Sequence, residues 1–177
     1  NFTYHLDKLT GHYVAKSEDG YSLTAPGQKI VRAVIAGSGF DDTEVAPTRR
    51  DFPCPRCGES PLEIRYRDGA VYMTCHTCGG VLDADGVPRG TVAIWEFDPA
   101  GLVGRSPAQL HVAGGISSRY RFRMMRDGIC PECSGVTNQS YQYCEDHVPA
   151  SDGICSNCGS ADSVRVRYTC SVCKYFD

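Results

Sequence analysis

The sequence predicts an α+β protein built from several small modules, on the basis of three observations in its 177 residues. Cysteines occur in closely spaced pairs, short alternating stretches end in glycine turns, and longer stretches have helical periodicity. Modules this small bury too little apolar surface to be stable alone, so bound metal is expected to stabilise them. The predicted parts are a helix–hairpin–helix segment over 1–37, a linker over 38–52, a β module over 53–98, a basic connecting helix over 99–127 and two further modules over 128–177.

The first segment opens with an amphipathic helix followed by a hairpin. Phe2, Leu6 and Leu9 have the i, i+4, i+7 spacing of one helical face. Strands are predicted over 13–16 and 21–23, joined by a charged turn that ends in glycine. A second helix follows, with a threonine cap, a glycine stop and an apolar stripe formed by Ile30, Val31, Val34 and Ile35.

A helix, a two-stranded wing and a further helix resemble the second half of a winged helix-turn-helix, in particular that of ArsR-like transcriptional regulators. The matching stretches are Thr3-Tyr4-His5-Leu6, Lys8-Leu9, Tyr21-Ser22-Leu23-Thr24 and Gly27. The helices that precede the recognition helix in that family have no counterpart before residue 1, so we expect this sequence to be a fragment of a longer regulator. The metal-sensing cysteine motif of that family would lie in missing or altered positions, so the resemblance does not imply that this protein senses arsenic or another metal.

The resemblance implies that the first helix enters the major groove of double-stranded DNA. Four residues of this helix would then reach bases or phosphates, and two lysines would contact the backbone. The first group is Asn1, Thr3, Tyr4 and His5, and the second is Lys8 and Lys16. The alternative is an amphipathic helix whose polar face is merely solvated.

Eleven cysteines and one histidine form six pairs, each with two intervening residues. This spacing lets both side chains of a pair bind one ion, and twelve ligands suffice for three tetrahedral sites. A disulfide framework would leave one thiol unpaired, because eleven is odd. We therefore expect three structural Zn²⁺ ions, with iron as the main competitor. The pairs are Cys54/Cys57, Cys75/Cys78, Cys130/Cys133, Cys144/His147, Cys155/Cys158 and Cys170/Cys173.

The module over 53–98 has the pattern of a zinc ribbon, in which a hairpin joins the first two pairs. Apolar and charged residues alternate over 62–67, and Asp68-Gly69 is a strong hairpin turn. His76, inside the second pair, is expected to be exposed and not to bind metal. A further strand over 92–97 places Trp95 and Phe97 on one face, where core packing is favoured over the floor of a ligand pocket.

The connecting helix begins at a capping Ser106, with Gln109 three residues later, and ends before Gly128. Residues 119–124 also alternate with period two, as a strand would, but a continuous helix is favoured. Its arginine flank would offset the acidic modules beside it; contact with DNA phosphate is the less favoured alternative. That flank consists of Arg119, Arg123 and Arg126.

The last four pairs fit either two consecutive modules or an interleaved cross-brace. Sequential pairing is favoured, because a hairpin inside each gap would suffice and residues 164–168 alternate as a strand. His147 then completes a site with three cysteines. The extension as a whole resembles the cysteine-rich C-terminal extensions of archaeal ArsR-like regulators, through the stretches Gly104-Arg-Ser-Pro107, Gly128-Ile-Cys-Pro-Glu-Cys-Ser-Gly135, Cys144-Glu-Asp-His147 and Tyr168-Thr-Cys-Ser-Val-Cys-Lys174.

The charge and composition of the chain exclude several classes of function. The formal charge is −3, and eleven thiolates holding three divalent ions would bring it to about −8, which excludes a basic nucleic-acid binder overall. No stretch is apolar enough for a membrane span, and paired thiolates indicate a reducing, cytoplasmic setting. Closed four-ligand sites without a thioredoxin-like context predict no enzymatic activity.

These observations predict a DNA-binding transcriptional regulator whose zinc modules serve dimerisation, contact with a protein partner or signal sensing. The alternative is a zinc-ribbon module that binds protein or single-stranded RNA and has no sequence-specific affinity for DNA.

Overall fold

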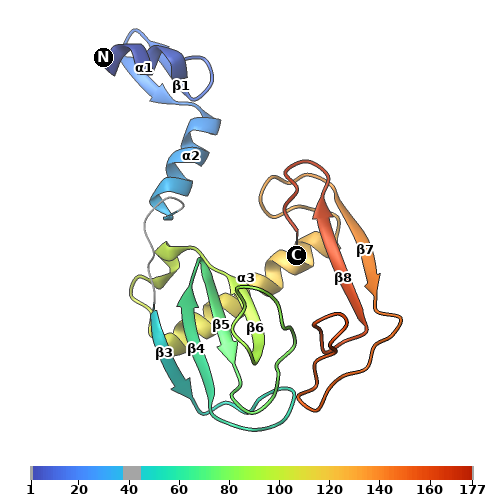
Figure 1. The fold of residues 1–177 in the computed structure, drawn as a ribbon. Coiled ribbons are helices and arrows are strands. Elements are labelled where there is room, and N and C mark those ends of the chain that lie inside the picture. The colour runs from blue at the N-terminus through green and yellow to red at the C-terminus, as the bar shows by residue number, and fades with distance from the viewer. Residues whose placement is uncertain (1, 38–44, 177) are drawn as a thin grey trace. The chain divides into compact units, whose positions relative to one another are not determined.

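The computed structural model describes residues 2–37 and 45–176, and the chain divides into two compact units. The first unit comprises Asn1–Asp41 with Asp98–Val103, and the second comprises Asp42–Phe97 with Gly104–Asp177. The described residues form three α-helices, one short 3-10 helix and three separate antiparallel sheets (Figure 1). The predicted α+β class is therefore confirmed.

The first unit has the predicted order of helix, hairpin and helix. Its elements are α1 (Phe2–Leu9), β1 (Val14–Ser17), β2 (Gly20–Leu23) and α2 (Ala25–Ile35). The two strands pair in antiparallel register from Val14 opposite Leu23 to Ser17 opposite Gly20. The 3-10 helix η1 (Pro99–Leu102) returns to this unit, where the Ala100 amide donates to the Ala36 carbonyl at 3.1 Å.

The start of α2 packs directly against the chain that enters the hairpin. The predicted cap is present, because the Thr24 hydroxyl accepts from the Gly27 amide at 3.2 Å and donates to the His12 carbonyl at 2.7 Å. Gly27 is buried, and a Cβ atom there would lie 2.0 Å from the Tyr13 carbonyl oxygen. Only glycine permits this approach.

The second unit is organised around a four-stranded antiparallel sheet with the strand order β3-β4-β5-β6. Its strands are β3 (Val45–Arg50), β4 (Leu62–Arg67), β5 (Ala70–Thr74) and β6 (Thr91–Glu96). The two central strands supply most of its core, with Leu62, Ile64, Tyr66 and Val71 at most 2% exposed. The predicted Asp68-Gly69 turn joins β4 to β5, and both of its residues have positive φ.

Strand β3 lies within residues 38–52, for which the sequence predicts a linker without secondary structure. It pairs with β4 from Val45 opposite Tyr66 to Arg50 opposite Leu62, with an irregularity between Val45 and Thr48. The prediction failed here because β3 is a mostly exposed edge strand that contains Pro47, so the usual alternation is absent. Residues 38–44 of the predicted linker lie outside the described residues.

Helix α3 (Pro107–Arg126) is continuous over 20 residues, as predicted, and the strand alternative over 119–124 is wrong. Ser106 and Gln109 form a reciprocal capping box at its start. The helix packs on the four-stranded sheet through Trp95, whose ring lies 5.4 Å from the His111 ring and against Gly114. Trp95 thus packs in the core, as the preferred prediction has it, and it also lines a cleft of the second unit.

The last sheet is a single long ribbon of β7 (Thr137–Tyr143) and β8 (Val164–Cys170). These strands pair from Thr137 opposite Cys170 to Tyr143 opposite Val164, so the two segments run side by side over their whole length (Figure 1). A small core joins this ribbon to α3, because Met125 is buried with Cys130 and Tyr168.

Candidate metal centres

The first centre is formed where the hairpin β4–β5 brings its two flanking pairs together. Cys54 and Cys57 precede β4, and Cys75 and Cys78 follow β5. The Sγ atoms of Cys54 and Cys78 are 3.7 Å apart, as are those of Cys57 and Cys75.

These separations fit a tetrahedral metal ion. Four sulfurs bound at about 2.3 Å would lie about 3.8 Å from one another, whereas a disulfide bond requires about 2.05 Å. Backbone amides also point at the sulfurs: Arg56 donates to Cys54 at 3.4 Å and Thr77 to Cys75 at 3.3 Å. The four thiols are thus placed to hold one metal ion.

The left-handed residue after the second cysteine recurs in several pairs but is not always glycine. Gly58 and Gly159 have φ of 79° and 63°, whereas after Cys78 the positive φ falls on Gly80, with φ 83°, and not on Gly79. After Cys133 and Cys173 the same conformation falls on non-glycine residues, namely Ser134 with φ 62° and Lys174 with φ 64°. The same left-handed turn therefore forms after these cysteines even though the residue there is not glycine.

The second centre joins the two ends of the β7–β8 ribbon that lie next to α3. Its ligands are Cys130, Cys133, Cys170 and Cys173. The Sγ atoms of Cys130 and Cys173 are 3.6 Å apart, and those of Cys133 and Cys170 are 3.5 Å apart. Cys130 and Cys170 are completely buried.

The third centre lies at the opposite end of the ribbon. It consists of Cys144 and His147 after β7 and Cys155 and Cys158 before β8. The His147 Nδ1 atom is 3.5 Å from the Cys158 sulfur, so Nδ1 is the ring nitrogen that faces the thiols. The set contains three cysteines and one histidine, as the sequence predicts, although two of the partners of His147 differ.

The sequential pairing of the last two sites is wrong, and so is the cross-brace alternative. The four pairs are nested: the outer two form the second centre and the inner two form the third. The physical reason is the length of the strands. Each gap of ten or eleven residues contains one strand of seven residues, β7 or β8, which leaves no room for a hairpin within the gap. The two strands pair with each other instead, and this brings the pairs together end by end.

Within the first centre, the pKa values of neighbouring thiols diverge. Burial, assisted by the Cys54 and Cys75 side chains, raises the pKa of Cys78 to about 12. Burial also acts to raise the pKa of Cys75, but backbone N–H groups of Cys78 and Thr77 outweigh it and lower that pKa to about 7. Four adjoining thiols therefore cannot all ionise without a cation, and a bound metal ion would supply that charge.

The other two centres show the same divergence. Burial opposes ionisation of Cys155 and of Cys170, but backbone N–H groups of Asn157 and Cys173, respectively, outweigh it and bring both pKa values to about 6. In the third centre, burial and the neighbouring thiols raise the pKa of Cys144 to about 11. Each centre thus contains at least one sulfur that is prepared to bind as the thiolate.

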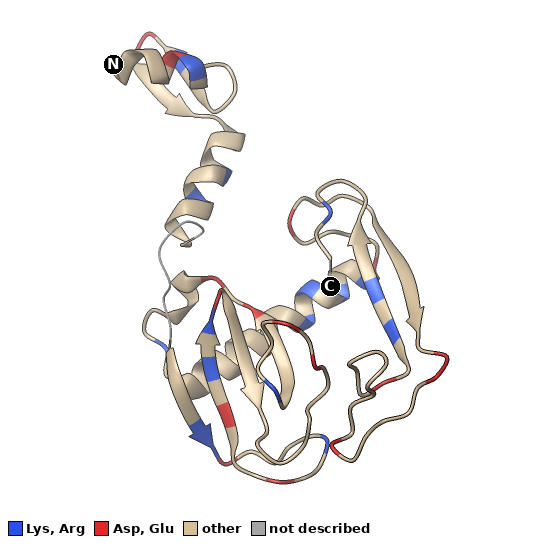
Figure 2. Ribbon diagram, in the orientation of Figure 1, with Lys and Arg blue, Asp and Glu red and all other residues tan. Residues whose placement is uncertain are grey.

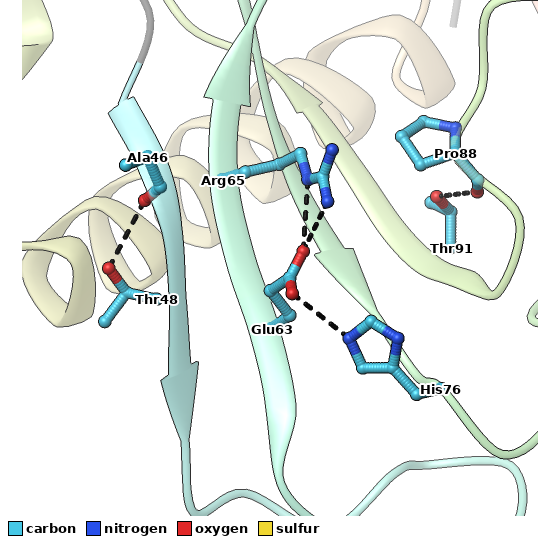
Figure 3. A network of polar contacts seen from close by, with 7 residues as sticks. All are labelled: Ala46, Thr48, Glu63, Arg65, His76, Pro88 and Thr91. Atoms are coloured by element: carbon cyan, nitrogen blue, oxygen red, sulfur yellow. Dashed lines mark hydrogen bonds and ion pairs between the residues drawn. The ribbon is translucent and has the colours of Figure 1, made fainter.

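His76 is exposed and stands apart from the metal centre, as predicted. Its Nε2 atom lies 3.1 Å from a carboxylate oxygen of Glu63, whose other oxygen accepts from Arg65 (Figure 3). Burial of the carboxylate acts to raise the pKa of Glu63, but Arg65 and His76 outweigh it and lower that pKa below its ordinary value. This network braces the strand β4 beside the second cysteine pair.

Comparison with protein families places these centres within a single domain. The family described as "Domain of unknown function (DUF7351)" matches residues 51–177. The chain belongs to this family. The DUF7351 match contains all twelve predicted ligands and α3. A second description, "Domain of unknown function (DUF7347)", matches residues 1–34, which include α1 and the hairpin. No curated protein and no solved structure matches the chain.

The DUF7351 region also links its first and third centres through backbone hydrogen bonds that the sequence did not predict. Directly after Cys78, the Gly79 amide donates to the Asp152 carbonyl at 2.9 Å, and the Asp83 amide donates to the Gly159 carbonyl at 2.7 Å. Arg89 adds an ion pair with Asp152 at 2.9 Å. No sequence signal could have found this contact, because both segments have the composition of loops.

The predicted DNA-contacting residues lie in the DUF7347 match, and those that the structure describes have exposed side chains. Thr3, Tyr4, His5 and Lys8 are on α1, and Lys16 is on β1. The Tyr4 and His5 rings meet edge to face at 5.5 Å, and the Lys8 amine lies 5.6 Å from the Tyr4 ring centre. Asn1 lies outside the described residues.

Across residues 2–37 and 45–176, no helix combines the length and the apolar character that crossing a lipid bilayer requires.

Proposed function

We propose that this protein is a DNA-binding transcriptional regulator of the winged-helix, ArsR-like type, in which structural zinc ions hold the second unit together. The observation that supports it most is the order α1, β1, β2, α2, a helix followed directly by a two-stranded wing and a second helix. In a winged helix, the recognition helix and the wing contact DNA, and the side chains of His5, Lys8 and Lys16 are exposed on the corresponding elements α1 and β1.

Helix α1 has the surface that groove binding requires. None of its described side chains is buried, so Thr3, Tyr4, His5 and Lys8 are accessible to a partner. Hydroxyl and imidazole groups can hydrogen-bond to base edges or phosphates, and lysine neutralises phosphate. These groups supply the direct contacts in the proposed complex.

The wing adds a second cationic contact. Lys16 is exposed on β1, and its amine lies 5.4 Å from the centre of the Tyr21 ring on the paired strand. This contact restrains the lysine and reduces the side-chain entropy that it would lose on binding phosphate. Lys8 and Lys16 are therefore the proposed backbone contacts.

Zinc is the metal that the three donor sets fit best. Thiolate and imidazole ligands in closed four-coordinate sets are the usual composition of structural zinc sites. Every ligand position is occupied by a protein atom, which leaves no open position for substrate, so we assign these centres a structural role and the protein no enzymatic activity. Thiolates that bind metal require a reducing compartment, which supports a cytoplasmic location.

A duplex-binding assay tests the proposal. The zinc-loaded protein is titrated with duplex fragments of its own promoter region, and the apparent Kd is measured at increasing salt. We expect affinity to fall steeply with salt, and Lys8→Ala/Lys16→Ala to reduce the salt slope by about two. Lys29→Ala, which removes an exposed lysine of α2, is the control. The proposal is contradicted if the protein does not bind the duplex at low salt. It is also contradicted if Lys8→Ala/Lys16→Ala and Lys29→Ala have the same affinity and the same salt slope.

A second candidate, a protein-interaction module, is favoured by the exposed end of the β7–β8 ribbon. Tyr141 and Tyr143 stack at 6.2 Å, and they are 53% and 68% exposed. Their cross-strand partners Val166 and Val164 are also exposed, which makes a continuous apolar face. Tyr141→Ser/Tyr143→Ser would abolish capture of a protein partner and leave duplex affinity unchanged.

A further inference from the structure

The second unit contains a cleft between its four-stranded sheet and its long ribbon. The cleft measures about 390 Å³ and is bordered by β6, α3 and β8. The lining residues that matter here are Trp95, Glu96, Arg121, Arg165, Arg167 and Phe176. Its volume is within the range of small-molecule sites, about 300–1,000 Å³. The cleft is separate from all three metal centres, since no metal ligand lines it.

Positive charge is concentrated in the cleft although the chain is acidic. Arg165 and Arg167 are two residues apart on β8, so their side chains emerge on the same face of the strand. Figure 2 shows basic residues, in blue, along this strand. Among the described residues, neither has an ion pair with a carboxylate. Arg121, by contrast, is paired with Glu96 at 3.5 Å and with Glu132. The two arginines of β8 therefore provide charge that the described protein groups do not neutralise.

Flat and apolar surface adjoins these arginines. The Arg167 guanidinium lies 5.0 Å from the centre of the Phe176 ring, and that ring is still 59% exposed. Ile94, which also lines the cleft, is 43% exposed. Exposed apolar groups in a concave site are stabilised when a ligand removes them from water.

We propose that this cleft binds a nucleoside phosphate, with the phosphate at Arg165 and Arg167 and the base over Phe176 and the neighbouring apolar side chains. Guanidinium groups match phosphate oxygens in bidentate geometry, and a base stacks on aromatic and guanidinium planes. Inorganic phosphate would leave the apolar surface uncovered. Duplex DNA presents no free base face, so this site differs from the proposed contact of α1 with DNA.

A nucleoside phosphate can be a free nucleotide or one residue of a single-stranded nucleic acid. Both offer the same base and phosphate groups to the cleft. The experiment therefore includes one arm for each source.

The test uses the intact zinc-loaded chain and two readouts, calorimetric titration and tryptophan fluorescence. Trp95 is the only tryptophan and lines the cleft, so its emission reports occupancy at this place. The probes are adenosine 5′-monophosphate, a single-stranded hexa-adenylate, adenosine and inorganic phosphate. We expect saturable binding of at least one of the first two, with a fluorescence change, and much weaker binding of adenosine and phosphate alone.

Variants locate the site. Arg165→Ala/Arg167→Ala is expected to weaken binding by about tenfold or more, because it removes the charged hydrogen-bond donors. Phe176→Ala is expected to weaken binding by removing the stacking surface, without changing charge. Arg119→Ala is the control, since Arg119 is an exposed arginine of α3 outside the cleft lining. Metal content and circular dichroism verify that each variant is folded.

The outcomes are distinct. Equal affinity for the mononucleotide and the oligonucleotide identifies a free nucleotide as the ligand, whereas binding of the oligonucleotide alone identifies a single strand. No saturable binding of either probe overturns the proposal, as does unchanged affinity in folded Arg165→Ala/Arg167→Ala, or phosphate that binds as tightly as the nucleotide. The result is independent of the duplex contact, because Lys8→Ala/Lys16→Ala leaves this cleft intact.

Discussion

Removal of the Cys155/Cys158 pair distinguishes nested from sequential ligand pairing, because the two arrangements lose different centres. With nested pairs, the double variant Cys155→Ser/Cys158→Ser loses the third centre, which is the one that contains His147. With sequential pairs it would lose an all-cysteine centre and keep the histidine. Both arrangements lose one metal ion, so the chemistry of the remaining sites decides between them.

The expected magnitude follows from the ligand sets. The intact protein has eleven sulfur ligands for three ions, about 3.7 per ion. Nested pairing leaves two all-cysteine centres and therefore an average of 4 sulfurs per metal with no imidazole. Sequential pairing would leave one all-cysteine site and one site with three cysteines and a histidine, an average of about 3.5.

The assay combines elemental analysis with zinc X-ray absorption of protein reconstituted without oxygen. We expect the metal content to fall from three to two equivalents and the histidine signal to disappear. Cys54→Ser/Cys57→Ser is the matched control, because it removes the first centre in either arrangement and leaves His147 bound. A double variant at Cys155 and Cys158 that retains the histidine signal would refute the nested arrangement.

Three further predictions concern stability. Gly27→Ala places a Cβ atom 2.0 Å from the Tyr13 carbonyl oxygen and should destabilise the first unit by about 1–3 kcal/mol, measured by thermal unfolding of that unit. Gly115→Ala, whose Cβ would make ordinary contact with Trp95 at 3.7 Å, should stabilise α3 by about 0.5–1 kcal/mol, measured as a rise in Tm. The carboxylate removed by Glu63→Gln has a lowered pKa in the folded state, so it stabilises the fold above its unfolded pKa, about 4.3, and less as the pH falls. The difference in unfolding free energy between wild type and Glu63→Gln should therefore shrink as the pH approaches 4, and denaturant titrations of both proteins at each pH measure it.

The sequence predicted the caps and turns that form between residues close to each other in the chain. Ser106 and Gln109 are three residues apart and close the capping box on α3. Asp68 and Gly69 are adjacent and determine the β4–β5 turn, which in turn brings the first four cysteines together. In each case the signal and the structure that it specifies lie within a few residues, so local propensity and tertiary contacts agree.

Features that depend on distant strand pairing could not be predicted. Residues 137–143 show no clear alternation between apolar and charged side chains, and their partner strand begins more than twenty residues later, at Val164. The spacing of the cysteine pairs indicates which residues are placed to hold metal, but it carries no information about which pair joins which. The edge strand β3 escaped prediction for a related reason, since its pairing with β4 rather than its own pattern makes it a strand.

The nested topology also connects the metal centres to the proposed nucleotide cleft. The ribbon β7–β8 has one centre at each end; α3 adjoins one end, and backbone bonds from residues 79–83 hold the other. Arg165 and Arg167 lie between these two attachments, so the position of their guanidinium groups relative to β6 depends on both centres. Loss of either ion would release one end of the ribbon and separate the arginines from the opposite wall. Metal ions bound at these two centres would therefore hold both ends of the ribbon and, with it, one wall of the cleft.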